Sequence, residues 1–253
     1  MIMIQQGITP ANPALPPGKR LYAIGDIHGR FDLLEQLLEM IGVDAEDAPT
    51  EDDKILIFLG DYVDRGPDSK RVLDLLSMPP PAGFQMICLK GNHEDMLLQF
   101  LDGEGAMISW LKNGGRETLK SYGLNVKNLA MSRVTDAVVE KARTEMRAAM
   151  PGSHIEFLAS LDLIYLEGDY AFAHAGIKPG VSLEAQKEPD LIWIRDEFLK
   201  SDADFGKVII HGHSVASLPS IRANRIGIDT GAWRTDVLTC LVLEGQERWF
   251  LST

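Results

Sequence analysis

The sequence predicts an α/β fold in which two β-sheets are each backed by helices. The first half of the chain alternates short apolar runs with segments of helical periodicity, an order typical of a mainly parallel sheet with right-handed crossovers. The second half is rich in short β-like runs, which suits a second sheet. The chain has 253 residues, 45% of them hydrophobic, which is enough for one large domain with a full core.

The N-terminal elements follow from the positions of the apolar residues. Residues 55–59 form a continuous apolar run, as expected of a strand that is covered on both faces. In residues 31–41, the apolar side chains instead recur at helical spacing. We expect strands over 20–25, 55–59 and 84–89, and helices over 31–41, 69–76 and 94–101.

A segment without ligand-type motifs, residues 103–160, interrupts this alternation. We expect helices in it over 106–112, 115–122, 134–150 and 155–160. The segment is either a helical insertion that shapes a groove near the site or a plain helical layer packed on the sheet. Beyond it we expect one helix over 191–200 and strands over 163–166, 170–173, 208–210, 225–228, 237–243 and 248–251.

Composition limits the partners and the compartment. The net charge of −12 disfavours non-specific binding to nucleic acid or to an anionic membrane. No apolar run approaches the roughly 18 residues of a membrane span, and we expect a cytoplasmic protein. Residues 1–18 suggest a loose, Pro-rich tail before a single domain over 19–253. Cys88 and Cys240 lie in apolar runs and are expected to be buried free thiols.

Five short blocks flanked by glycine follow apolar runs and carry ligand-type side chains. They read GDIHG at 25–29, GDYVDRG at 60–66, GNHE at 91–94, HAG at 174–176 and HGH at 211–213. Ligands bind at the carboxyl ends of the strands in sheets of this kind. Carboxylate, amide and imidazole groups suit divalent cations such as Zn, Mn or Fe. Two neighbouring metals are a common device for activating water against phosphorus. The sequence therefore predicts a metal-dependent phosphoester hydrolase.

Spacing suggests how the ligands are shared. Asp26 and His28 are two residues apart at a strand end, so one metal can take both side chains. Asp61 follows the next strand and is placed to bridge two metals. The later residues that would complete the second metal are Asn92, His174 and His213.

His93 is the candidate general acid. It is adjacent to Asn92, so both side chains cannot point at the same metal from an extended segment, and His93 is free to donate a proton to a leaving oxygen. Asp64 would orient its ring, and Arg65 and Arg195 would hold phosphate oxygens. The alternatives are a structural ion pair between Asp64 and Arg65, and an ordinary exposed helix position for Arg195.

Two further histidines have weaker contexts. His154 lies in the helical segment away from any ligand motif and is expected at the surface. His211 is two residues from His213, so it either faces the site as well or serves only the fold.

These motifs, together with GIDTGA at 227–232 and WLKNGG at 110–115, resemble the phosphoprotein phosphatase family of the calcineurin-like metallophosphoesterases, in particular bacterial and bacteriophage serine/threonine protein phosphatases. The resemblance spans roughly residues 20–235. It implies a four-layer α/β/β/α metallophosphoesterase sandwich with a helical insertion over 103–160. It also implies a dinuclear site and direct attack of metal-bound hydroxide on phosphorus, with no phosphoenzyme.

The resemblance also implies roles for individual residues. The first metal would be held by Asp26, His28 and Asp61, and the second by Asp61, Asn92, His174 and His213. His93 would be the general acid, paired with Asp64. The phosphate contacts would come from Arg65, Arg195, Asn92 and Lys90. Many members carry Arg where this chain has Lys90, and a lysine can contact phosphate only as a point charge. We expect manganese as the metal, with Fe, Zn, Co or Ni as alternatives.

Three functions fit this reading. The first is a serine/threonine protein phosphatase that acts on a phosphorylated protein or peptide. The second is a symmetrical dinucleoside tetraphosphate hydrolase or another small-molecule phosphoesterase, for which Trp110, Lys112 and Arg116 could form a base-binding pocket. The third is a non-catalytic binding protein, which would be expected to have lost a ligand or His93, and neither is missing. The sequence makes no prediction about the oligomeric state.

Overall fold

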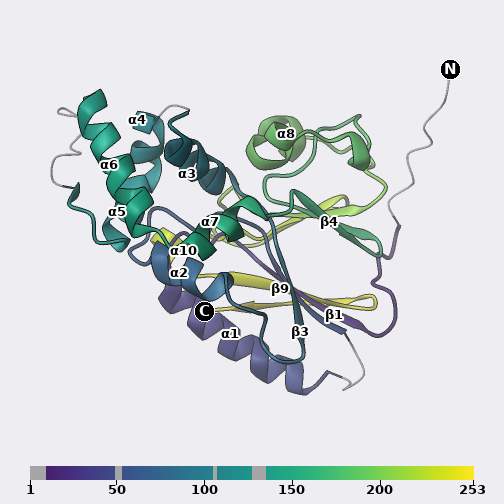
Figure 1. The fold of residues 1–253 in the computed structure, drawn as a ribbon. Coiled ribbons are helices and arrows are strands. Elements are labelled where there is room, and N and C mark those ends of the chain that lie inside the picture. The colour runs from purple at the N-terminus through teal and green to yellow at the C-terminus, as the bar shows by residue number, and fades with distance from the viewer. Residues whose placement is uncertain (1–9, 49–52, 105–106, 127–134) are drawn as a thin grey trace.

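Two mixed β-sheets stack face to face in the structure, a computed structural model that describes residues 10–48, 53–104, 107–126 and 135–253 (Figure 1). The first sheet has the strand order β10-β9-β1-β2-β3, with β1, β2 and β3 parallel and β9 and β10 antiparallel. Its strands are β1 (Lys19–Ile24), β2 (Asp53–Phe58), β3 (Phe84–Cys88), β9 (Thr239–Glu244) and β10 (Glu247–Ser252).

The second sheet has the strand order β4-β5-β6-β8-β7. Its central strands β5, β6 and β8 run parallel, and β4 and β7 pair antiparallel at the two edges. The strands are β4 (Ile164–Glu167), β5 (Tyr170–Ala173), β6 (Val208–His211), β7 (Ser220–Ile221) and β8 (Arg225–Gly227). The short edge strand β7 is absent from the sequence prediction, and the other nine strands agree with it to within a few residues.

Alternating side chains create the four layers. In β1, Leu21 and Ala23 belong to the core between the two sheets, whereas Tyr22 and Ile24 belong to the core shared with α1 (Phe31–Glu46). In β5, Ala171 and Ala173 face a third core that includes residues of α8 (Glu188–Trp193) and α9 (Asp196–Leu199). Helices α1 and α8 therefore cover the two outer faces (Figure 1), and the predicted α/β/β/α sandwich is confirmed.

The remaining helices gather at one end of the sheets (Figure 1). They are α2 (Ser69–Leu76), α3 (Asn92–Asp102), α4 (Met107–Trp110), a π-helical turn η1 (Leu111–Gly115), α5 (Arg116–Ser121), α6 (Asp136–Ala149), α7 (Gly152–Ala159) and α10 (Ala232–Thr235), with a 3-10 turn η4 (Leu183–Ala185) nearer the second sheet. The predicted starts of two of these helices, at 106 and 134, lie outside the described residues.

Three local expectations need correction or refinement. The helix predicted over 191–200 is two helices, because the backbone at Arg195 (φ −135°, ψ −104°) is not helical. Residues 13–15 are not loose: the Leu15 amide donates to Gly245 O, and its side chain is buried between the sheets. Both cysteines are free thiols, but Cys88 is only half-buried. Among the described residues, no helix combines the length and apolar character that crossing a membrane requires.

Candidate active site

Five of the predicted site residues lie on turns in an uncommon backbone conformation. Among the described residues, positive φ outside glycine occurs at Asp236 and at five predicted site residues. These five are His28, Asp61, Asp64, Arg65 and His213. Left-handed backbone at such residues is strained and persists where the surrounding structure holds it for function.

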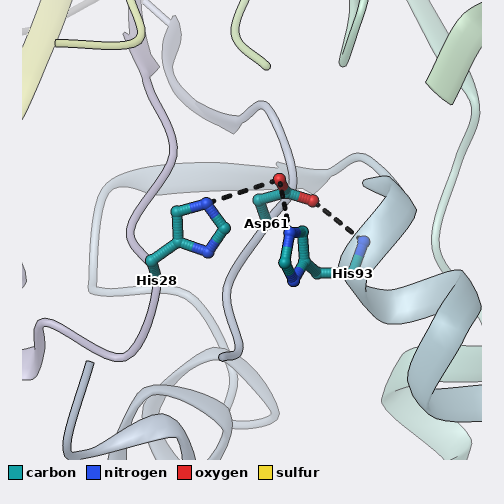
Figure 2. A group of neighbouring side chains, drawn as sticks. All are labelled: His28, Asp61 and His93. Atoms are coloured by element: carbon teal, nitrogen blue, oxygen red, sulfur yellow. Dashed lines mark hydrogen bonds and ion pairs between the residues drawn. The ribbon is translucent and has the colours of Figure 1, made fainter. Parts of the chain in front are cut away.

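Asp61 lies at the centre of the site. One carboxylate oxygen, Oδ2, is 3.5 Å from His28 Nε2 and 3.8 Å from His93 Nε2, and Figure 2 shows both imidazoles directed at this oxygen. The other oxygen, Oδ1, accepts a hydrogen bond from the His93 amide at 3.1 Å. The close approach of the β2 and β3 turns depends on Gly91, because a Cβ there would overlap Asp61 Oδ1.

A second group of ligand-type atoms meets the Oδ1 side of Asp61. His174 Nε2 lies 3.3 Å from Asp61 Oδ1, 3.1 Å from Asn92 Oδ1 and 3.2 Å from His213 Nδ1. Asp61 thus belongs to two His/Asp groups whose ligand atoms converge, one with His28 and His93 and one with His174 and His213.

The imidazole tautomers make these groups suitable for cations. His28 Nδ1 lies 2.9 Å from Val63 O, and His174 Nδ1 lies 2.9 Å from Leu59 O, so each Nδ1 donates and each Nε2 keeps its lone pair. Lone pairs on buried nitrogens and oxygens therefore face one another. His28 Nε2 and His213 Nε2 have no hydrogen-bond partner within the described structure, although both are buried. A divalent cation beside His28 and Asp61, and a second beside Asp61, His174 and His213, would satisfy these lone pairs, so the residues fit a pair of metals.

Burial also sets the protonation of the imidazoles. It lowers the pKa of His28 and of His174, in both cases against the opposite effect of Asp61. The pKa of His213 is lowered to about 2, first by burial and then by His174. Neutral imidazole is the form that binds metal.

Asp26 lies beside these groups rather than within them. Both of its carboxylate oxygens accept from the His213 amide at 3.1 Å, which ties the β1 turn to the β6 turn. Its pKa is raised well above the ordinary value by burial, then by Asp229 and Asp61. A cation nearby would offset this crowding of carboxylates.

His93 and Asp64 form a buried pair. His93 Nδ1 lies 2.6 Å from Asp64 Oδ2, and both side chains are almost fully buried. Asp64 also accepts from Trp110 Nε1 at 2.8 Å and from Thr118 Oγ1 at 2.6 Å. Burial lowers the pKa of His93, but Asp61 and the hydrogen bond to Asp64 outweigh it, so the net pKa is raised. This arrangement suits an imidazolium that can donate a proton.

Arg65 contacts the ring of His93 and not the carboxylate of Asp64. Its Nη2 donates to His93 Nε2 at 3.1 Å, because a guanidinium has no acceptor. The guanidinium carbon lies 5.3 Å from the centre of the Trp233 ring. The Arg65 amide donates to Gly114 O, and a Cβ on Gly114 would overlap that amide. The turn η1 therefore packs directly on the Asp64–Arg65 turn.

An open groove of about 670 Å³ leads from the solvent to His213 and Arg65. Arg195 lines it from the break between α8 and α9, with Nη1 3.5 Å from His213 O. The charged residues that line the groove are the basic Arg65, Lys112, Arg195 and Arg234 and the acidic Glu117. The groove is thus positively charged in a chain of net charge −12.

Several predicted residues lie elsewhere or do something different. Lys90 donates to Asp95 at 2.9 Å and to Glu188, so its contacts are with carboxylates. Trp110 is 1% exposed and cannot stack on a nucleobase. Arg116 donates to Val126 O at 3.3 Å. Of this proposed base-binding set, Lys112 alone lines the groove.

The two remaining histidines are both buried. His154 is 1% exposed, so the prediction of a surface residue is wrong: Nδ1 lies 2.7 Å from Tyr122 Oη, and Nε2 lies 3.1 Å from Asp74 Oδ1. His211 packs edge-on against Phe198, and its Nδ1 lies 3.0 Å from Gly212 O. Burial lowers its pKa to about 4.

Sequence reasoning missed the residues that brace the site. Glu94 is fully buried and accepts hydrogen bonds from four backbone amides, which belong to Asp61, Tyr62, Val63 and Gly91. Its position three residues after the N-cap of α3 is a capping-box signal that could have revealed it. Thr118 and Trp110 hold Asp64 from across the fold, and no local pattern marks that role.

Comparisons with known proteins agree with this geometry. A family model described as calcineurin-like phosphoesterase matches residues 19–234. Serine/threonine-protein phosphatase 2 of Escherichia coli (strain K12) is 29% identical over 226 residues, which cover 85% of this chain and 88% of that protein. An asymmetrical bis(5'-nucleosyl)-tetraphosphatase, PrpE, of Bacillus velezensis is 25% identical over 224 residues, 82% of each chain. The solved structure of a cold-active protein tyrosine phosphatase shares the fold, with a TM-score of 0.58 at 18% identity over 97% of this chain and 82% of that one.

Proposed function

The chain belongs to the calcineurin-like phosphoesterase family, and we propose that it is a metal-dependent phosphatase that releases phosphate from phosphoserine and phosphothreonine side chains. The observation that carries this proposal is the convergence of buried acceptor atoms on Asp61, beside a histidine that is paired with a buried carboxylate. The first feature suits cations, and the second suits proton donation to a leaving oxygen.

The metals would be divided between the two sides of Asp61. Asp26, His28 and Asp61 would hold one cation, and Asp61, Asn92, His174 and His213 would hold the other. When bound, such a pair of cations supplies a water of lowered pKa and offsets the negative charge of the phosphoryl group. Manganese remains our expectation, with Fe, Zn, Co or Ni as alternatives.

The chain's own residues would complete the reaction. Arg65 and Arg195 reach the groove from two different loops and would grip the phosphate oxygens through their planar donor groups. With phosphate present, Arg65 would exchange its hydrogen bond to His93 Nε2 for one to the substrate. His93, protonated and held by Asp64, would then give the Nε2 proton to the leaving serine or threonine oxygen. Glu94 keeps the Asp61 turn rigid while this occurs.

A dinucleoside tetraphosphate is the second candidate substrate. Relatives named bis(5'-nucleosyl)-tetraphosphatases reach 31% identity, over 65% of this chain and 46% of the symmetrical enzyme of Aromatoleum aromaticum. The four basic residues of the groove also suit a chain of several phosphates. We favour the phosphoprotein substrate for two reasons. Among the relatives that cover more than four fifths of both chains, the protein phosphatase of Escherichia coli is 29% identical and the tetraphosphatases are 25–27% identical, and Trp110 is buried away from any nucleobase.

The test is a comparison of turnover by the metal-loaded enzyme. After chelator treatment and addition of Mn²⁺, kcat/KM is measured for a phosphoserine peptide, a phosphothreonine peptide and diadenosine tetraphosphate. A clearly higher value for either peptide supports the proposal. A preference for the dinucleotide makes the second candidate correct, and the absence of metal-dependent hydrolysis of all three contradicts both.

A further inference from the structure

The groove contains more positive charge than one phosphate monoester requires. Arg65 and Arg195 already provide two guanidinium groups for the phosphate that is hydrolysed. Lys112 on η1 and Arg234 on α10 (Ala232–Thr235) add two further cations. Acidic residues outnumber basic ones by 37 to 25 in the chain as a whole, so this local excess does not reflect the composition.

These two additional cations are not used by the fold. Neither Lys112 nor Arg234 forms an ion pair with another described residue, whereas Lys90, at the end of β3, is held by two carboxylates. Both side chains are exposed, and Glu117 is the single acidic residue beside them among the described lining residues. Neither charge is therefore neutralised by an ion pair within the described structure.

Trp233 connects this additional pair to the phosphate-binding pair. Trp233 lines the groove and is 38% exposed. The guanidinium carbon of Arg65 lies 5.3 Å from the ring centre, and that of Arg234 lies 5.9 Å from it. Contacts of this kind between a cation and an aromatic ring are attractive, so Trp233 is placed to hold the two arginines at a fixed separation.

From these observations we propose that Lys112 and Arg234, the second of which is held beside Arg65 by Trp233, form a subsite for a second anionic group of the substrate. We call these three residues the second-anion subsite. The inference rests on the proposed function: in a phosphopeptide, the second group is the carboxylate of an acidic residue next to the phosphorylated one. The same chemistry could come from a further phosphate of a dinucleotide, and the experiment separates the two sources.

The experiment compares substrate preferences rather than absolute rates. kcat/KM is measured for a phosphoserine peptide flanked by glutamates, for the same peptide flanked by alanines, for diadenosine tetraphosphate and for p-nitrophenyl phosphate. The proteins are wild type, Lys112→Ala, Arg234→Ala, the double variant and Trp233→Phe. Lys120→Ala, an exposed lysine on α5 outside the groove, is the control for the loss of one positive charge.

We expect wild type to prefer the glutamate-flanked peptide, mainly through KM. Each single alanine variant should reduce that preference by about threefold, and the double variant by about tenfold, as for partly exposed charge pairs. Added salt should reduce it in wild type as well. Trp233→Phe should retain most of the preference, and Lys120→Ala should retain all of it. Glu117→Gln should increase it, because this change removes the acidic side chain that lines the groove with Lys112 and Arg234.

Two results would overturn the proposal. One is a double variant that keeps the wild-type preference for the glutamate-flanked peptide and also keeps the wild-type ratio of kcat/KM for diadenosine tetraphosphate to kcat/KM for p-nitrophenyl phosphate. The other is an equal loss of preference in Lys120→Ala, which would make the effect one of net charge. If the double variant keeps the peptide preference but has a lower ratio of kcat/KM for diadenosine tetraphosphate to kcat/KM for p-nitrophenyl phosphate, the subsite is supported and its second anion is a phosphate.

Failure of the proposed function gives a different result. If p-nitrophenyl phosphate is hydrolysed but neither the peptides nor the dinucleotide are, the subsite is tested by inhibition instead. A glutamate-rich peptide should then inhibit p-nitrophenyl phosphate hydrolysis better than its glutamine counterpart in wild type, but not in the double variant. Equal inhibition by both peptides in wild type would contradict the subsite.

Discussion

The Nδ1 atom of His93 lies 2.6 Å from Oδ2 of Asp64, a carboxylate with no exposed surface. Asp64 keeps no ion pair with Arg65 in the described structure, because its two oxygens are taken by His93, Trp110 and Thr118. The carboxylate therefore serves the imidazole, and the role of His93 as a proton donor becomes testable.

Replacing His93 by asparagine should abolish proton donation while leaving a side chain of similar polarity. We expect kcat to fall by about 10²- to 10⁴-fold, with the largest loss for substrates with poor leaving groups. Metal content should stay close to that of wild type. Steady-state kinetics on a phosphoserine peptide and on p-nitrophenyl phosphate measure the difference, and a variant with near wild-type turnover of the peptide would remove His93 from this role.

Trp110 should act on the reaction through Asp64. Trp110→Phe keeps an aromatic ring against Phe100, whose ring centre lies 4.5 Å from that of Trp110, but it removes the donor to Asp64 Oδ2. Because hydrogen bonds to charged groups contribute about 1.5–3 kcal/mol, we expect kcat to fall roughly tenfold or more. KM should change little. Tyr170→Phe, which removes the hydrogen bond to Pro13 O far from the groove, is the matched control. If Trp110→Phe changed KM as much as kcat, the substitution would have disturbed the structure of the site as a whole rather than the Asp64–His93 pair alone.

His154 should contribute to the pH dependence of stability. Burial lowers its pKa in the folded state, against the effect of Asp74. The folded protein therefore binds fewer protons than the unfolded chain between the lowered pKa and the ordinary value of about 6.5. The stabilisation is present above about pH 6.5 and is lost as the pH falls toward the lowered pKa.

The variant His154→Gln cannot titrate, so the free energy of unfolding should fall less between pH 7.5 and pH 5.5 than it does in wild type. Urea unfolding at both pH values measures this difference. The other buried histidines contribute equally to the pH dependence of the unfolding free energy in wild type and variant, so their contributions cancel in the comparison. A pH dependence as steep in the variant as in wild type would show that His154 titrates alike in the folded and unfolded chains.

The sequence was sufficient for the parts of the fold that depend on local patterns. Continuous apolar runs such as 55–59 predict β2 because a strand buried on both faces has no polar side. Asp61 and His174 could be predicted as site residues because each follows the carboxyl end of a predicted strand, β2 in the first sheet and β5 in the second. The structure adds the tautomers of His28 and His174, which depend on backbone carbonyls that no motif specifies.

Long-range contacts explain what sequence reasoning missed. Trp110 and Thr118 are 46 and 54 residues from Asp64, and their hydrogen bonds exist only once α4 and α5 pack against the Asp64 turn. The break at Arg195 has no proline or glycine to mark it. His154 is buried because Tyr122 and Asp74 converge on it from other helices, which periodicity within its own helix does not indicate.

Metal stoichiometry tests the central claim most directly. The chain is stripped with chelator, loaded with Mn²⁺, dialysed and analysed by elemental mass spectrometry beside Asp61→Asn, with circular dichroism to confirm folding. We expect two metals per chain in wild type and loss of both in the variant, because Asp61 is shared by both ligand groups. Folded wild-type protein that retains no metal, or an Asp61→Asn variant that still binds two, would contradict the account.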